Sequence, residues 1–161
     1  MAGEKQGNPK GTQPLVPYIW VDDAAKALEF YAKALGATEK VRLTFPGSDK
    51  VMHGEMQVGG NTFMLGEASR EHGHSTPRQL GGNHSALLIY VPDVDAAMAK
   101  AERAGCEVTM AAEDMFWGDR MGSIKDSFGH SWMLATHKRE VTPAEMEKAM
   151  KEMMSRMQDK T

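Results

Sequence analysis

The sequence predicts an α+β fold built from two similar units, each a strand followed by a helix and three further strands. An internal repeat carries this prediction: Ile19–Asp23 recurs as Ile89–Asp93, 70 positions later, and Phe63–Leu65 recurs as Trp132–Leu134 at a shift of 69. Strand and helix periodicities also follow one another in the same order in both halves. The alternative, two α+β pieces without a shared cavity, is disfavoured because separate pairs keep nearly the same offset.

The first half shows each element of the unit in order. A strand over residues 15–21 is rich in β-branched and aromatic side chains. Asp22 and Asp23 offer an N-cap to a helix from Ala24 to Leu35, and Gly36 is expected to end it. Three more strands follow, the last two joined by a turn at residues 59–61: Val41–Phe45, Val51–Val58 and Thr62–Leu65.

These patterns divide the chain into five segments. Residues 1–14 form a flexible N-terminal leader, 15–66 the first βαβββ module, 67–83 a linker loop, 84–137 the second module and 138–161 a C-terminal amphipathic helix. The loop is dense in Gly, Ser, His and Pro and is a candidate rim or lid. Residues 142–145 read as a capping box, and a Met stripe follows at positions 146, 150, 153 and 157. We expect that stripe to dock on its own domain or a sister subunit; recognition of a foreign partner is the alternative.

Composition excludes several classes of protein. The formal net charge of −3, with both signs interspersed, provides no basic face for nucleic acid. No apolar run approaches the ~20 residues that a membrane helix requires. The single cysteine, Cys106, cannot form an intramolecular disulfide, and the first residues lack the apolar core of a signal peptide. We therefore expect a soluble, cytoplasmic protein.

The most informative stretch is Trp117–His137, which reads as two strands joined by a tight turn at residues 126–129. Its W-G-D-R and D-S-F-G-H-S-W motifs resemble the closing hairpin of the vicinal oxygen chelate superfamily, within it the PhnB-like glyoxalase/bleomycin-resistance branch; Ser127 stands where that branch usually has Pro. The resemblance covers about Pro14 to His137. It implies a curved, incomplete barrel around a ligand cavity (the glyoxalase/bleomycin resistance/dioxygenase fold) and a homodimer.

Metal-dependent members of the superfamily hold a divalent ion with His, Gln or Glu on the first, fourth, fifth and eighth strands. Spacing places these four positions at Val16, Met64, Ala86 and Met133. Neither aliphatic side chains nor thioethers suit Zn²⁺, Mg²⁺, Ni²⁺ or Fe²⁺. The sequence therefore predicts no metal cofactor. A non-standard site built from His53, Glu55 and His84 is the alternative.

Strand parity predicts what faces the cavity instead. An apolar and aromatic wall suited to flat ligands is expected from six ligand-binding residues: Tyr18, Trp20, Met64, Leu88, Tyr90 and Met133. The competing interpretation is that they fill a closed core.

We expect the remaining polar or reactive residues to have structural and not catalytic roles. Asp126 is expected to cap turn amides and His130 to pack beside Trp132, while Asp119 and Arg120 pair with the same turn. Cys106 is expected to be a buried, unreactive thiol.

Two functions follow from these expectations. The first is metal-free binding of a small apolar or aromatic molecule, as in bleomycin-resistance proteins that confer antibiotic resistance by sequestration. The second is a metal-dependent lyase or isomerase of glyoxalase type. The missing ligand set favours the first, and whether the chain is an enzyme stays open.

Overall fold

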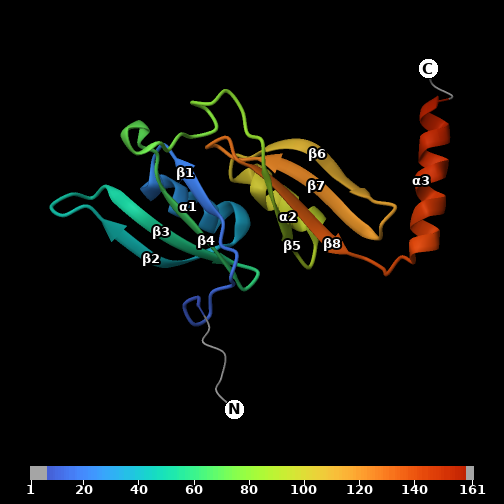
Figure 1. Ribbon diagram of the computed structural model, residues 1–161, viewed down its shortest axis with the longest axis horizontal. Helices are drawn as coiled ribbons and strands as arrows, with labels where there is room; N and C mark the ends of the chain where they lie inside the picture. Colours follow the sequence, from blue (N-terminus) through green and yellow to red (C-terminus); the bar gives the residue numbers. More distant parts are fainter. Residues whose placement is uncertain (1–6, 159–161) are drawn as a thin grey trace, which may run out of the picture.

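The computed structural model describes residues 7–158, which form two four-stranded sheets with a helix packed against each (Figure 1). The first module contains β1 (Tyr18–Val21), α1 (Ala24–Leu35), β2 (Thr38–Thr44), β3 (Val51–Val58) and β4 (Asn61–Glu67). The second contains β5 (Ala86–Tyr90), α2 (Val94–Arg103), β6 (Glu107–Asp114), β7 (Asp119–Lys125) and β8 (Ser131–His137). The short 3-10 helix η1 (Arg70–His72) lies in the linker, and α3 (Pro143–Gln158) follows the second sheet.

The two sheets have the same topology, with strand orders β1-β4-β3-β2 and β5-β8-β7-β6. In each sheet the first and last strands of the module pair in parallel, and the other neighbours are antiparallel. The register is also equivalent, since Tyr18 pairs with Met64 and Leu88 pairs with Met133. The predicted pair of βαβββ modules is confirmed.

The first helix begins and ends as its sequence predicts, and the second helix begins with the same kind of cap. Asp23 accepts a hydrogen bond of 3.0 Å from the amide of Lys26, and Asp93 accepts one of the same length from Ala96. Gly36 ends α1 in the left-handed region, with φ at 67°, where a glycine carries no Cβ penalty.

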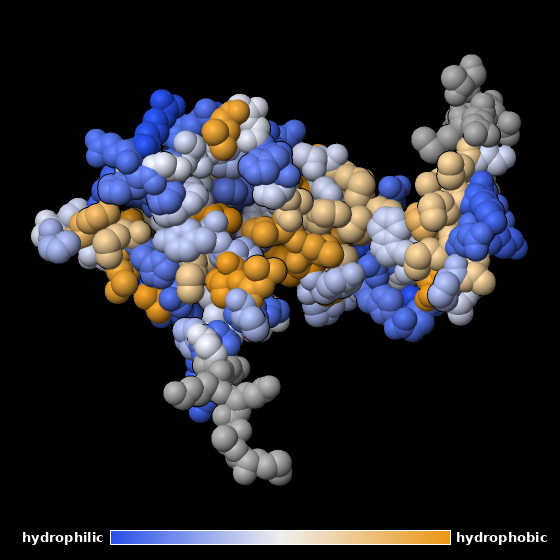
Figure 2. All heavy atoms as spheres, in the orientation of Figure 1, coloured by the Kyte–Doolittle hydropathy of each residue, from blue (hydrophilic) through white to orange (hydrophobic). Residues whose placement is uncertain are grey.

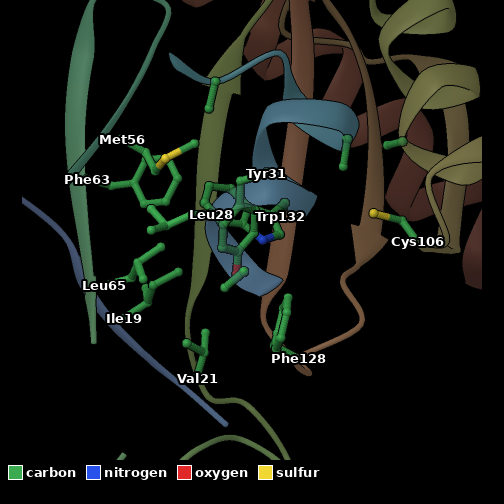
Figure 3. Packing of buried hydrophobic residues seen from close by; sticks show 14 of the residues in the cluster. Ile19, Val21, Leu28, Tyr31, Met56, Phe63, Leu65, Cys106, Phe128 and Trp132 are labelled. Atoms are coloured by element: carbon green, nitrogen blue, oxygen red, sulfur yellow. The ribbon is translucent and has the colours of Figure 1, made fainter. Parts of the chain in front are cut away.

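One hydrophobic core joins the two modules. Tyr31 of α1 packs against Phe63 of β4 and Trp132 of β8, with ring centroids 5.4 and 5.5 Å apart (Figure 3). Cys106 and Phe128 belong to the same cluster of buried residues. Because both helices pack into this shared core, the opposite face of each sheet is left open.

The predicted boundaries differ at three strands and in the leader. β4 runs from Asn61 to Glu67, whereas the sequence predicts Thr62–Leu65. β1 begins at Tyr18 rather than residue 15, because Pro14 and Pro17 lack the amide hydrogen that a continued strand would use. β2 begins at Thr38, three residues before the predicted Val41. Residues 1–6 of the predicted leader lie outside the described residues, whereas Gln13 at its end is held by the backbone of Thr62.

The C-terminal helix forms with the predicted cap. The Thr142 amide donates to the Glu145 carboxylate at 2.8 Å, and the Glu145 amide donates back to the Thr142 hydroxyl at 3.3 Å. α3 stands away from both sheets (Figure 1), so the expected docking on its own domain is wrong for the described part of the chain. Met150 and Met153 are exposed on it. Among residues 7–158, no helix is long and apolar enough to cross a membrane.

Candidate functional site on the open sheet faces

The six predicted ligand-binding residues divide between the two open faces, three on each sheet. Tyr18, Trp20 and Met64 lie on the first sheet, and Leu88, Tyr90 and Met133 lie on the second. Tyr18 is 40% exposed, Leu88 47% and Tyr90 56%, so the alternative that these residues fill a closed core is wrong. The six do not close into one ring within this chain. Met64 and Met133 pair with Tyr18 and Leu88 in the sheets but line neither of the two cavities described next.

The first cavity has a volume of about 290 Å³ and lies between β1 and the linker. Its walls include Tyr18, Trp20, His84 and His130. The linker reaches the open face beside it, where His74 stacks on Trp20 with ring centroids 3.7 Å apart and planes at 9°. The other neighbour of Trp20 is Tyr18, at 4.7 Å between centroids. The linker thus forms the rim that its composition suggested.

A row of polar groups continues from this aromatic stack across the first sheet. The Tyr18 hydroxyl lies 3.0 Å from Nδ1 of His53, and Nε2 of His53 lies 3.3 Å from Oε1 of Glu55. Partial burial raises the pKa of Tyr18 above its ordinary value, so its hydroxyl stays protonated at neutral pH.

Neither set of potential metal ligands fits a divalent ion. Of the four superfamily positions, Val16 and Ala86 have no donor atom, and Met64 and Met133 offer only thioether sulfur. In the alternative set, His53 and Glu55 meet each other, but within residues 7–158 no three His, Cys, Asp or Glu side chains come together as a ligand group. His84 lies on the wall of the neighbouring cavity instead, so the structure does not bring the three residues together.

The second cavity, of about 260 Å³, lies between the β3–β4 turn and β5. Leu88 and Tyr90 line one side, Phe63 and Trp132 contribute to its walls, and Gln13 lies at its edge. Figure 2 shows apolar surface gathered at the junction of the two modules. The cavity is therefore more apolar than the first.

Beyond this cavity, Tyr90 joins a cluster around Asp119. Its hydroxyl donates to the Asp119 carboxylate at 2.9 Å, Trp117 Nε1 donates at 3.2 Å, and His137 Nδ1 lies 2.8 Å away. Burial alone would raise the pKa of Asp119, but the hydrogen bonds from His137, Tyr90 and Trp117 outweigh it and hold this pKa below its usual range.

The pairing predicted for Asp119 and Arg120 with the 126–129 turn is wrong. The two residues begin β7, whereas the turn follows its other end. Arg120 instead binds Asp95 through two hydrogen bonds of 2.8 Å and lies 3.3 Å from Asp114.

Asp126 has the structural role predicted for it. Its Oδ1 accepts the amides of Phe128 and His130, each at 2.9 Å. His130 does more than pack locally, since its Nε2 lies 2.9 Å from the carbonyl oxygen of Trp20. Sequence reasoning missed this link between the turn and the first open face, and no local pattern signals it.

Comparisons with known proteins agree with this geometry. The model of the Glyoxalase/Bleomycin resistance protein/Dioxygenase superfamily matches residues 13–134. An uncharacterised protein of Mycobacterium bovis is 43% identical over 140 residues, covering 84% of this chain and 91% of that protein. An uncharacterised Arabidopsis thaliana protein is 31% identical over 125 residues, covering 72% of this chain and 73% of its own length.

Solved structures show the same fold. The crystal structure of an Arabidopsis thaliana gene product superposes with a TM-score of 0.63 at 27% identity, covering 76% of this chain and 98% of that one. TioX from a Micromonospora species superposes with a TM-score of 0.62 at 22% identity, covering 78% and 98%. The paired modules and their open faces define a protein of the glyoxalase fold. By the family match, the chain belongs to the Glyoxalase/Bleomycin resistance protein/Dioxygenase superfamily.

Proposed function

We propose that this chain binds a small apolar or aromatic molecule on its open sheet faces without a divalent metal, as a member of the PhnB-like branch. The observation that carries the proposal is the parallel stack of His74 on Trp20, with ring centroids 3.7 Å apart. An imidazole from the linker occupies the place that a flat ligand ring would take. A planar ligand displaces His74 and gains the aromatic surface of Trp20.

The sizes of the cavities support completion of the site by a second copy. At about 290 and 260 Å³ they lie at or below the lower limit of ligand pockets, which is roughly 300 Å³. Tyr18, Leu88 and Tyr90 remain exposed beside them. A homodimer that brings two open faces together enlarges the cavity and covers these side chains. Sequestration of a toxic compound in the cytoplasm, as in antibiotic resistance, is the role we assign to such a site.

A ligand screen by thermal unfolding tests the binding function. Apolar and aromatic compounds should stabilise the protein, by about 2.7 kcal/mol at one hundred times the dissociation constant. Trp20→Ala should abolish the shift because it removes the stacking surface, and His74→Ala should enlarge it because the ligand no longer competes with the imidazole.

Phe116→Ala is the matched control, since Phe116 is an aromatic residue of the second module that lines neither cavity. Equal loss of the shift in Phe116→Ala and Trp20→Ala would contradict the proposed site. Metal analysis of protein purified without chelator tests the other half of the proposal. Stoichiometric divalent metal, with loss of thermal stability in EDTA, would favour the metal-dependent lyase or isomerase instead.

A further inference from the structure

We infer that Glu55, His53 and Tyr18 form a proton relay that removes the proton of a weakly acidic hydroxyl on the bound aromatic molecule. This inference rests on the proposed function for the presence of that molecule and adds its chemical class, phenols and similar hydroxyls on planar rings. The three side chains lie in a row on the open face of the first sheet, beside Trp20.

The backbone makes room for this row at Gly66. Tyr18 on β1 reaches His53 on β3 although β4 lies between these strands. A Cβ atom at Gly66 would stand 2.9 Å from the Tyr18 hydroxyl oxygen and 3.0 Å from the Trp20 ring. The absence of a side chain there therefore permits both the relay and the aromatic stack.

The fold itself does not require these polar residues. Gly54 pairs with Leu65 in the first sheet, and Gly122 pairs with Leu134 at the equivalent place in the second. The residue before this glycine is His53 in the first module and Met121 in the second. The residue after it is Glu55 in the first module and Ser123 in the second. Tyr90 pairs with Ala135 as Trp20 pairs with Gly66, so the second module has an alanine at the position of Gly66. The second sheet forms with the same topology without the relay, which separates the relay from a purely structural role.

The proposed relay assigns a direction to these two contacts. Nε2 of His53 donates to the Glu55 carboxylate, and Nδ1 accepts the hydrogen of the Tyr18 hydroxyl. The lone pairs of the Tyr18 oxygen then remain available to a ligand hydroxyl. His53 and Glu55 side chains are 21% and 26% exposed, so water screens their interaction only in part.

The proton transfer balances without another reactant. The ligand O–H bond breaks as its proton moves to the Tyr18 oxygen, while the original Tyr18 proton moves to Nδ1 of His53. The products are a ligand oxyanion that accepts a hydrogen bond from Tyr18, and an imidazolium ion beside the Glu55 carboxylate. The carboxylate stabilises the positive ring, which favours the ionised ligand.

Other titratable groups near the relay have partners of their own. His74 stacks on Trp20, and His130 contacts the Trp20 carbonyl. Lys50 pairs with Glu67 at 2.8 Å, and His84 lies on the wall of the neighbouring cavity. The test must therefore change the relay residues themselves.

Absorbance of para-nitrophenol, whose phenolate is yellow, provides that test with the full-length protein. Para-nitrophenol fully bound by excess protein should turn yellow about one pH unit below the pKa of the free compound, a change of about tenfold in the phenolate-to-phenol ratio. His53→Gln, Glu55→Gln and Tyr18→Phe should lose this shift, each measured at saturating protein so that weaker binding does not imitate it. His137→Gln, which alters a histidine between two carboxylates on the other sheet, should keep it.

The outcomes distinguish the relay from the binding function. Binding of para-nitrophenol without a shift, or with a shift that survives His53→Gln, would overturn the relay and leave the binding function in place. Absence of binding by any aromatic compound would remove both. Nitrogen NMR of the ligand-free protein adds a readout that needs no ligand: the hydrogen of neutral His53 should reside on Nε2, and the Nδ1 tautomer would contradict the relay.

Discussion

The hydroxyl of Tyr31 in α1 donates a hydrogen bond of 2.8 Å to the carboxylate of Asp126, 95 residues further along the chain. Trp132 Nε1 donates to the same oxygen at 2.8 Å, and the amides of Phe128 and His130 donate to the other oxygen. Burial and the neighbouring carboxylate raise the pKa of Tyr31 well above its ordinary range. Asp126 thus links α1 of the first module to the turn between β7 and β8 of the second by hydrogen bonds.

Removing this link should destabilise the protein without changing its fold. Tyr31→Phe removes one hydrogen bond to a buried charged group and should cost about 1.5–3 kcal/mol of the free energy of unfolding. Asp126→Asn should cost more, because one amide oxygen cannot replace two carboxylate oxygens that accept four hydrogens. Urea denaturation measures both. Tyr90→Phe, at an exposed tyrosine that also donates to a carboxylate, is the control; a larger loss there would refute the ranking.

Sequence reasoning predicted the local half of this arrangement. The Asp126–Gly129 turn was predictable because its chemistry resides in four consecutive residues, and the caps at Asp23 and Thr142 were predictable for the same reason. The partners Tyr31 and the Trp20 carbonyl were not, since no periodicity reports which distant side chain meets a turn.

The same difference between local patterns and long-range contacts explains which features of the ligand-binding residues could be predicted. Strand parity identified which side chains leave the core, because alternate residues face opposite sides of a sheet. It could not show that the two open faces remain separate within one chain, because that depends on how α1 and α2 share the core. It also could not find the contact between Tyr18 and His53, which depends on the missing side chain of Gly66.

His137 should make stability depend on pH. Its hydrogen bond to Asp119, helped by Glu140, raises the pKa of His137 above its ordinary value. The stabilisation is therefore fully present below the unfolded pKa of about 6.5 and is lost as pH rises through the higher folded value. Urea denaturation across neutral pH should show the wild-type protein losing stability relative to His137→Gln. The His72→Gln variant, at a histidine bonded to the neutral Ser69 hydroxyl, should keep the wild-type profile; the same flattening in both variants would contradict the assignment.

Cys106 should be unreactive in the native protein. It is 6% exposed, and burial, with a smaller effect of Asp126, raises the pKa of its thiol to about 11. At pH ~8 only about a thousandth of such a thiol is ionised. A chromogenic disulfide reagent should therefore react within its mixing time only in denaturant. Rapid stoichiometric labelling under native conditions would show that Cys106 is accessible and the surrounding core open.

The C-terminal helix should act between molecules and not within one. α3 stands away from both sheets, and Met150 and Met153, each 44% exposed, have no receptor surface in the described part of their own chain (Figures 1 and 2). Deleting residues 142–161 should lower the mass measured by light scattering or change the solubility. The thermal unfolding midpoint should stay near that of the full chain when both proteins are compared in the same association state, because the deletion leaves the shared core untouched. The double variant Met150→Gln with Met153→Gln should reproduce the change in mass, whereas Lys148→Gln with Lys151→Gln, on the charged part of the same helix, should not. An unchanged mass and solubility after the deletion would exclude α3 from self-association.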